Sequence, residues 1–387
     1  MTATVVLALD SFKGSITAAG ACDALAAGWR ETDPDARLVA RPMADGGEGT
    51  RDAFAAAVPG ARRMPVVVTG PAGRDIPAEW MLLPPAPDAP SSTGVVELAG
   101  TSGIELLGET RLPFDAHTVG FGQAIAAALD HGVSRLILGI GSSASTDGGS
   151  GMLRALGARF PGALGLRGLR AVTAVDVAEM RMPPPGGALV LSDVTNPLLG
   201  PTGAAAVFGA QKGLAPGDVA DADAALRHWS EILAAALPDA DAAAAGAGAA
   251  GGTGFALQAW GARLVSGSAE VADLVRLPKA LAGASLVVTG EGSFDAQSAA
   301  GKAPAQVAAL AAAAGVPIAL VAGRIAPDAD TSSFAASVSL AALAGSAEAA
   351  RSDPERWLRA AGRLLAERGG DPAPPAEDIR SIRPRRD

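Results

Sequence analysis

The chain has 387 residues and a formal net charge of −9, and 49% of its residues are hydrophobic. The negative charge argues against nucleic acid or an anionic membrane as the main partner, because both are themselves negatively charged. The single cysteine, Cys22, excludes an internal disulfide framework and a cysteine-rich metal site. The length exceeds that of one typical core, so two domains are expected.

Short aliphatic runs alternate with alanine-rich stretches along most of the chain, a pattern typical of α/β proteins. The runs predicted as strands are 5–9, 38–41, 66–69, 79–83, 95–98, 136–140, 189–191, 286–289 and 318–321. The stretches predicted as helices are 17–30, 120–131, 220–237, 303–314 and 354–368. In the first of these helices, Cys22, Leu25 and Trp29 recur at spacings of three and four, which predicts one buried face.

The order of these elements predicts a discontinuous domain with a second one inserted. Residues 63–94 are punctuated by proline and glycine and resemble antiparallel strands, whereas the pattern from about 285 onward resembles the opening of the chain. We therefore expect a Rossmann-like parallel-sheet domain from residues 1–62 and 285–368, and an inserted α/β domain at 63–284. Residues 369–387 lack apolar periodicity and are expected to form a disordered tail.

No basic leader opens the sequence, and no apolar stretch free of charge and glycine is long enough to span a bilayer. We therefore expect a cytoplasmic protein with no membrane partner, acting as a monomer or a homodimer.

Only four of the 31 basic residues are lysines, and three of these lie in glycine-rich turns. These three are Lys13, Lys212 and Lys302, whereas Lys279 has no such setting. A compact ammonium group beside glycine-freed backbone amides is well suited to a phosphate oxygen, and a planar guanidinium does not imitate it. The three lysines are therefore candidate anion ligands, and surface lysines without a role are the alternative.

Six clusters of glycine and carboxylate residues follow predicted strands or open predicted helices. They occupy residues 10–15, 44–50, 139–151, 192–212, 246–254 and 289–302. Ligands of open α/β sheets bind outside the carboxyl ends of the strands, where such loops gather. Glycine lets the backbone approach a phosphate, and a following helix offers its positive N-terminus. The 139–151 loop is therefore predicted to bind phosphate through amides at the start of the helix after Gly149.

Other nucleotide-binding and catalytic motifs are weak or missing from the sequence. A G-x-G-x-x-G spacing, as within 246–251, arises about once by chance in a chain with 49 glycines. Gly139, Gly141 and Ala144 could form a dinucleotide fingerprint, but no acid follows about 20 residues later to hold a ribose. The chain has no Walker loop and no protein-kinase motif set, and its three histidines lie outside the motif loops. Acid–base chemistry is therefore assigned to carboxylates.

Taken in order, the six clusters resemble those of the glycerate kinase family, in its two-domain microbial type, over roughly residues 4–365. The resemblance rests on Asp10-Ser-Phe-Lys13-Gly-Ser, Ala44-Asp45-Gly-Gly-Glu48-Gly-Thr50, Asn196-Pro197-Leu-Leu-Gly-Pro and Thr289-Gly-Glu291-Gly. The chain departs from the family pattern in the 139–151 loop, where Ser142, Ser145 and Thr146 replace glycine, threonine and asparagine. The missing glycine at 142 bears on how tightly that loop can fold.

The resemblance implies ATP-dependent phosphorylation of D-glycerate in a cleft between two domains. In this type the acceptor is the C2 hydroxyl, and the product is 2-phospho-D-glycerate. The implied cofactors are ATP and Mg²⁺, and the implied partners are the small-molecule substrates. Phosphoryl transfer needs positioning and charge neutralisation more than covalent help, and Mg²⁺ needs only one or two protein oxygens. Loops rich in lysine, glycine and carboxylate meet both needs.

The resemblance also implies roles for particular residues. The catalytic candidates are Asp193, Lys13, Asp45 and Asp295. The cofactor-binding candidates are Gly139, Gly141, Ser142, Ser143, Asp147, Gly148, Gly149, Lys212, Gly290, Glu291 and Lys302. The substrate-binding candidates are Asp10, Ser11, Lys13 and Asn196, and the metal-binding candidates are Asp193 and Asp295.

Asp193 is the first choice for the general base or a Mg²⁺ ligand. It follows a short apolar strand and precedes a rigid turn at Asn196-Pro197, which could fix its carboxylate. The sequence does not separate the two roles, and an aspartate before such a turn is often only a cap. The competing carboxylates are Asp10, Asp45, Glu291 and Asp295.

Two other functions stay open on the sequence alone. A nucleotide-dependent oxidoreductase would use the glycines at 139 and 141, and tight NAD binding without ATP binding would favour it. A non-catalytic, two-lobed small-molecule binding protein would be stabilised by its ligand without turnover.

Overall fold

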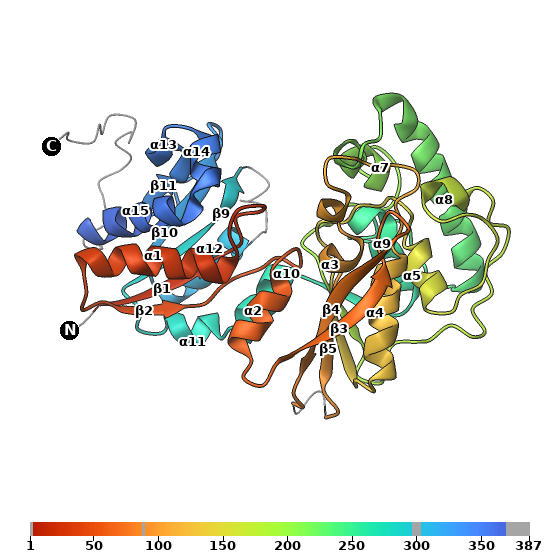
Figure 1. Ribbon diagram of the computed structural model, residues 1–387, viewed down its shortest axis with the longest axis horizontal. Helices are drawn as coiled ribbons and strands as arrows, with labels where there is room; N and C mark the ends of the chain where they lie inside the picture. Colours follow the sequence, from red (N-terminus) through yellow and green to blue (C-terminus); the bar gives the residue numbers. More distant parts are fainter. Residues whose placement is uncertain (1–2, 87–89, 296–302, 369–387) are drawn as a thin grey trace. The chain divides into compact units, whose positions relative to one another are not determined.

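The computed structural model describes residues 3–86, 90–295 and 303–368. The chain divides into two compact units, one formed by Met1–Ala44 with Val271–Asp387 and the other by Asp45–Glu270. Both units are α/β, as predicted, and each has its own sheet (Figure 1). The predicted tail at 369–387 lies outside the described residues.

The first unit is built on a parallel sheet with the strand order β11-β10-β9-β1-β2. Its strands are β1 (Thr4–Leu9), β2 (Arg37–Ala40), β9 (Leu286–Phe294), β10 (Ile318–Ile325) and β11 (Ala336–Ser339). Its helices are α1 (Ala18–Thr32), α11 (Leu277–Leu281), α12 (Ala303–Ala314), α13 (Leu340–Ala344), α14 (Ala347–Ser352) and α15 (Pro354–Glu367). The chain proceeds outward from β1 on one side and from β9 on the other, so β1 and β9 flank a topological switch point. Ligands of open α/β sheets bind at such points.

Helices from the two ends of the chain pack against each other in this unit, as α1 and α15 show (Figure 1). Cys22, Leu25 and Trp29 of α1 are buried on one face, as their spacing predicted. A Cβ atom at Gly28 would lie 1.9 Å from the carbonyl oxygen of Arg359, so only glycine permits this close approach of the two helices. Glycine and alanine thus supply part of the packing in a chain that is only 4% aromatic.

The second unit has a six-stranded sheet in the order β3-β4-β5-β6-β7-β8. The strands are β3 (Arg62–Thr69), β4 (Asp75–Leu83), β5 (Thr93–Glu97), β6 (Arg135–Gly139), β7 (Ala188–Leu191) and β8 (Arg263–Val265). β3, β4 and β5 pair antiparallel, and β5 through β8 pair parallel. The parallel part places the loops after β5, β6 and β7 at one edge of the sheet.

The helices of the second unit cover this sheet and carry most of its core. They are α2 (Thr50–Ala57), α3 (Ala99–Ser102), η1 (Ile104–Leu107), α4 (Val119–Asp130), α5 (Ser150–Ala155), α6 (Leu166–Leu169), α7 (Ala204–Phe208), η2 (Ala210–Lys212), η3 (Pro216–Asp218), α8 (Val219–Ala236) and α9 (Ala249–Ala259). Phe121, Trp229 and Trp260 are fully buried in one continuous cluster with residues of the sheet. Helix α10 (Gly267–Leu274) crosses from the second unit into the first.

The boundaries of the two units differ from those drawn on the sequence after residues 62 and 284. Residues 45–62 belong to the second unit, because α2 packs against β5 and Arg51 pairs with Glu97. Residues 271–284 belong to the first unit, where α11 packs against β1 and α12.

All nine predicted strands and all five predicted helices are present, so the alternating pattern was a sound guide to the fold. The sequence missed β8 and β11, which are short. It also ended β9 at residue 289, whereas the strand continues to Phe294 because Glu291 and Ser293 pair with β10.

Candidate active site

The switch point of the first sheet brings the first and sixth clusters together. The backbone N–H of Asp10, directly after β1, donates to the carbonyl oxygen of Gly290 in β9 at 2.8 Å. The buried Asp10 carboxylate accepts the backbone N–H of Ser11 at 2.6 Å. A Cβ at Gly292 would lie 3.4 Å from the backbone nitrogen of Lys13, an ordinary contact distance, so β9 passes next to the turn that carries the lysine.

This edge of the first sheet offers both signs of charge. Lys13 is exposed, Glu291 is buried, and Asp295 is half-buried just after β9. Gly290 lies inside the sheet, where a Cβ would fall 1.7 Å from the carbonyl oxygen of Val321, so its glycine serves strand packing. Lys302 lies outside the described residues.

In the second unit, the turn that follows Ala44 packs directly against the loop that follows β6. The backbone N–H of Gly141 donates to the carbonyl oxygen of Gly46 at 3.0 Å. A Cβ at Gly141 would lie 2.4 Å from Cα of Gly47, and one at Gly139 would lie 2.8 Å from the Gly46 oxygen. A Cβ at Gly46 would lie 2.3 Å from the carbonyl oxygen of Leu191, the last residue of β7. These glycines therefore bring the second and third clusters together over the carboxyl ends of β6 and β7.

Asp193 lies at the same edge, two residues after β7, and caps helix α10. Its Oδ1 accepts hydrogen bonds from Oγ of Ser266 at 2.7 Å and from the backbone N–H of Gly267 at 3.0 Å. Its Oδ2 accepts the backbone N–H of Ser268 at 3.4 Å. The carboxylate is thus fixed in orientation by a helix N-terminus, a setting that favours its charge.

Burial and a neighbouring carboxylate disfavour the charged form of Asp193. Burial raises the pKa of Asp193 above its ordinary value of 3.8, the hydrogen bond from Ser266 lowers it, and the neighbouring Asp45 carboxylate raises it. Asp45 is half-buried, and its Oδ1 accepts the backbone N–H of Gly47 at 3.0 Å. Two neighbouring carboxylates, each oriented by backbone N–H groups, are typical of acid–base and cation-binding sites.

Asp147 is buried and turned into the protein. Its Oδ2 accepts the backbone N–H groups of Thr118 and Gly151 and the hydroxyl of Thr118, at 2.8–3.2 Å. Its Oδ1 accepts the Ser145 hydroxyl at 3.1 Å and the backbone N–H of Gly149 at 3.2 Å. The amides at the start of α5, which the sequence assigned to a phosphate, therefore already donate to an internal carboxylate. This geometry makes Asp147 a residue that shapes the loop.

Lys212 is buried against the same loop. Its ammonium donates to Oγ of Ser143 at 2.7 Å and to the carbonyl oxygen of Ser145 at 2.6 Å. Burial lowers the pKa of Lys212 to about 7, and the charge of Asp147 opposes that shift. The lysine thus ties the fourth cluster to the third.

The fifth cluster and Asn196 also serve loop packing. A Cβ at Gly251 would lie 2.1 Å from the carbonyl oxygen of Ser145, and one at Gly248 would lie 2.2 Å from that of Pro197. The Asn196 amide donates to the carbonyl oxygen of Thr202 at 2.8 Å and so holds its own loop. These packing contacts account for the glycines at 248 and 251, two of the three in the G-x-G-x-x-G spacing.

The structure adds residues that the sequence reasoning missed. Ser266 both caps α10, through the backbone N–H of Ala269, and donates to Asp193. A serine at 266, a preferred N-cap residue, followed by an acidic residue in the first turn at Glu270 was a sequence indication of a helix start. The ion pair of Arg51 and Glu97 lies beneath the turn at residues 45–49, here called the Asp45 turn. Nothing in the sequence indicated that pair.

The fold and these loops define a class: an α/β enzyme whose lysines, glycines and carboxylates gather at the carboxyl ends of parallel strands. The model of the glycerate kinase family matches residues 5–368. Glycerate 2-kinase of Escherichia coli (strain K12) is 39% identical over 333 residues, covering 84% of this chain and 86% of that protein. Glycerate kinase of Halalkalibacterium halodurans is 38% identical over 331 residues, covering 83% and 86%. A crystal structure assigned to glycerate kinase 2 of Salmonella typhimurium LT2 superposes with a TM-score of 0.76 at 35% identity, covering 95% of this chain and 98% of that one.

The chain belongs to the glycerate kinase family. It is therefore a kinase that acts on glycerate with ATP as the phosphoryl donor, and the oxidoreductase and non-catalytic alternatives are set aside. None of the helices in the described part of the chain has the length and apolarity needed to cross a membrane.

Proposed function

We propose that this chain transfers the γ-phosphoryl group of ATP to the C2 hydroxyl of D-glycerate, with Mg²⁺ as the assisting cation. The C2 position is supported by the name of the E. coli relative, glycerate 2-kinase. The observation that carries the site is the meeting of the Asp45 turn, the Gly139–Gly149 loop and Asp193 at the carboxyl ends of β6 and β7.

In this proposal Asp193 accepts the proton of the glycerate hydroxyl or holds the cation. Its hydrogen bonds to the N-terminus of α10 fix the orientation of the carboxylate. Its raised pKa is a property that general bases share. Asp45 is the second carboxylate of the pair.

The donor set fits Mg²⁺. No group of three or more His, Cys, Asp or Glu side chains that could hold a metal occurs within residues 3–86, 90–295 and 303–368. Kinases bind Mg²⁺ through one or two carboxylates together with substrate phosphates, so such a group is not required. Asp45 and Asp193 would hold the ion, and a cation there would favour the charged form of Asp193, whose pKa is raised by burial and, to a smaller extent, by the charge of Asp45. When bound, Mg²⁺ neutralises charge on the transferring phosphates.

We assign phosphate contact in the 139–151 loop to its half-buried turn around Ser142, because the amides near α5 already donate to Asp147 and the amide of Gly141 donates to Gly46. Lys212 supports that turn through Ser143. In the first unit, the exposed Lys13 would bind an anion, either an ATP phosphate or the glycerate carboxylate. Asp10, Ser11, Glu291 and Asp295 are proposed to contribute at that edge. A cytoplasmic location and a monomeric or homodimeric state complete the proposal.

The test of the reaction is ADP release with D-glycerate, L-glycerate, glycerol and no acceptor, with the product assigned by ³¹P NMR. We expect turnover with D-glycerate and a 2-phosphate product. A 3-phosphate product would contradict the C2 assignment, and ADP release that D-glycerate does not raise above the rate without acceptor would contradict D-glycerate as the acceptor.

The role of Asp193 is tested by Asp193→Asn. We expect kcat to fall about 100-fold or more, within the range for removal of a general base, while the amide oxygen still caps α10. Asp176→Asn is the matched control, because Asp176 also accepts a backbone N–H but is exposed and lies in an isolated bridge with Arg159, outside the six clusters. Turnover within a few-fold of wild type would make Asp193 structural, and recovery at raised Mg²⁺ would make it a metal ligand.

The anion-binding role of Lys13 is tested by Lys13→Met, with Lys279→Met as the control lysine outside the glycine-rich turns. We expect Lys13→Met to raise KM or lower kcat while the melting temperature stays unchanged. Normal kcat and KM for both substrates would refute the role.

A further inference from the structure

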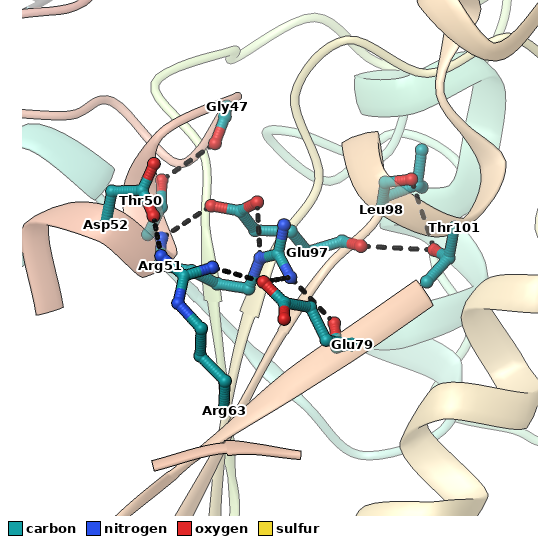
Figure 2. Close-up of polar contacts among 9 residues, drawn as sticks. All are labelled: Gly47, Thr50, Arg51, Asp52, Arg63, Glu79, Glu97, Leu98 and Thr101. Carbon is teal, nitrogen blue, oxygen red and sulfur yellow. Dashed lines mark hydrogen bonds and ion pairs between the residues drawn. The ribbon is translucent and has the colours of Figure 1, made fainter. Parts of the chain in front are cut away.

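A buried ion pair lies beneath the Asp45 turn, away from the residues assigned to chemistry. Glu97 is the last residue of β5 and only 3% exposed. Its Oε2 accepts Nε of Arg51 at 2.8 Å, and its Oε1 accepts the backbone N–H of the same residue at 2.5 Å (Figure 2). Arg51 also donates from Nη1 to the carbonyl oxygen of Glu79 at 2.9 Å. The arginine is thus held by two adjacent strands.

The contact between Glu97 and the Arg51 amide caps helix α2. The N-cap residue of α2 is Gly49, which has φ 92° and no side chain to satisfy the first backbone N–H groups. A carboxylate at this end of a helix accepts an orphan N–H and is favoured by the helix dipole. Glu97 therefore supplies from β5 the cap that the local sequence lacks.

The start of α2 is in turn tied to the Asp45 turn. The Thr50 hydroxyl donates to the carbonyl oxygen of Gly47 at 2.9 Å, and the Gly47 N–H donates to the Asp45 carboxylate at 3.0 Å (Figure 2). Hydrogen bonds from Glu97 to Arg51, from Thr50 to Gly47 and from Gly47 to Asp45, together with the peptide bond between Thr50 and Arg51, therefore connect Glu97 to Asp45.

The base of this series is itself rigid. The Thr101 hydroxyl donates to the carbonyl oxygen of Glu97 at 3.1 Å, and Glu97 is in register with Gly139 of β6. Gly139 begins the loop that packs on Gly46. Glu97 thus lies beneath both the Asp45 turn, through Arg51, and the 139–151 loop, through Gly139.

We propose that Glu97, acting through Arg51, is a positioning residue that holds the Asp45 turn in its catalytic geometry. The inference rests on the proposed function, because it takes the Asp45 turn to be part of the phosphoryl-transfer site. A displacement of about 1 Å at a reacting group can cost about 100-fold in rate, so a clamp below the site has a kinetic consequence. Burial raises the pKa of Glu97, and the charge of Arg51 opposes that shift.

Arg63, which pairs with Asp52 at 2.5 Å and with Glu79 on the exposed side of the ion pair, provides a control. Its side chain is half-exposed. Exposed pairs of this kind contribute little to stability. The Glu79 carboxylate also pairs with Arg51 at 3.1 Å, but without Arg63 the bonds of Arg51 to Glu97 and to the Glu79 carbonyl oxygen remain. Arg63→Ala should therefore leave kcat and KM unchanged.

The test compares Glu97→Gln with Val95→Ala, whose side chain is fully buried two residues earlier in β5. In Glu97→Gln one of the two oxygens becomes an NH₂ group that cannot accept from Arg51, so one of the two contacts and the negative charge are lost although the shape is kept. We expect kcat to fall about 10–100-fold at a temperature where circular dichroism shows a folded protein, with KM for ATP and D-glycerate within about threefold. Val95→Ala should lower the melting temperature and keep kcat. Backbone amides of residues 46–51 should exchange hydrogen faster in Glu97→Gln alone.

A kcat within a few-fold of wild type, or unchanged exchange at 46–51, would overturn the proposal and leave Glu97 as a structural residue. If Glu97→Gln does not fold, Arg51→Lys decides by the same two criteria, because lysine keeps the charge and loses the fork of donors. If the wild type does not phosphorylate D-glycerate, the proposed function fails, and the exchange comparison still decides whether the clamp exists.

Discussion

The substitution Ser142→Gly should stabilise this protein. Ser142 has φ 58°, in the left-handed region, where the glycerate kinase pattern has glycine. A side chain in that region costs roughly 1–2 kcal/mol. Glycine costs roughly 0.5–1 kcal/mol more in conformational entropy than another residue. The difference predicts that the free energy of unfolding rises by about 0.5–1 kcal/mol.

The assay for Ser142→Gly is thermal and urea unfolding, with Ala144→Gly as the control in the same loop. For a unit of this size the expected gain corresponds to a rise of roughly 1–4 °C in melting temperature. Ala144 is buried and has no positive φ, so its replacement by glycine should lower the free energy of unfolding by about 1–2 kcal/mol. If Ser142→Gly lowered the melting temperature as Ala144→Gly does, the backbone at 142 would not be strained and the reasoning would be refuted.

Three further predictions concern the same loop. Asp147→Asn should lower the free energy of unfolding by about 2–3 kcal/mol in urea titration, because an NH₂ group would face donors that now bind the carboxylate; an unchanged midpoint would contradict this. Thr146→Val should be neutral or stabilising, because the buried Thr146 hydroxyl has no hydrogen-bond partner among the described residues, and a clear loss of stability would show that one exists. Between about pH 7 and 10.5, the folded and the ordinary pKa of Lys212, this side chain binds fewer protons in the folded than in the unfolded protein. The free energy of unfolding of the wild type, relative to that of Lys212→Met, should therefore rise with pH across this window and be constant below it. A difference between the two proteins that stays constant across pH 7–10 would reject a buried ammonium group at Lys212.

Much of this fold followed from the sequence because its signals are local. Aliphatic runs between glycine-rich turns marked strands such as β1 and β6, and the spacing in α1 identified its buried face. β11, with the sequence Ala-Ser-Val-Ser, has no such pattern and becomes a strand only because β10 lies beside it. The end of β9, at Gly290-Glu291-Gly292, has glycines that are typical of a loop. It is a strand because its residues pair with β10, a contact that no local pattern reports.

The site was predictable as a set of loops but not as a set of side-chain contacts. The order of the clusters placed Asp45, the 139–151 loop and Asp193 at strand ends, and the structure brings them together within the second unit. The direction of the Asp147 carboxylate and the burial of Lys212 depend on residues far away in sequence, such as Thr118 and Ser143. No local pattern reports contacts of that kind.

Asp147 changes how the glycine-rich loop should be understood. A glycine-rich turn before a helix usually indicates an anion site, because it exposes amides at the positive end of the helix. Here the anion is internal: the Asp147 carboxylate takes the amides of Gly149 and Gly151 and is fully buried. The glycines at 46, 139 and 141 serve contact between loops, since each lacks room for a Cβ. A protein built this way needs its glycines to assemble the site even where they touch no ligand. The loop therefore meets the phosphate, in our proposal, at the half-buried turn around Ser142, with a shape that Asp147 and Lys212 have already fixed from within.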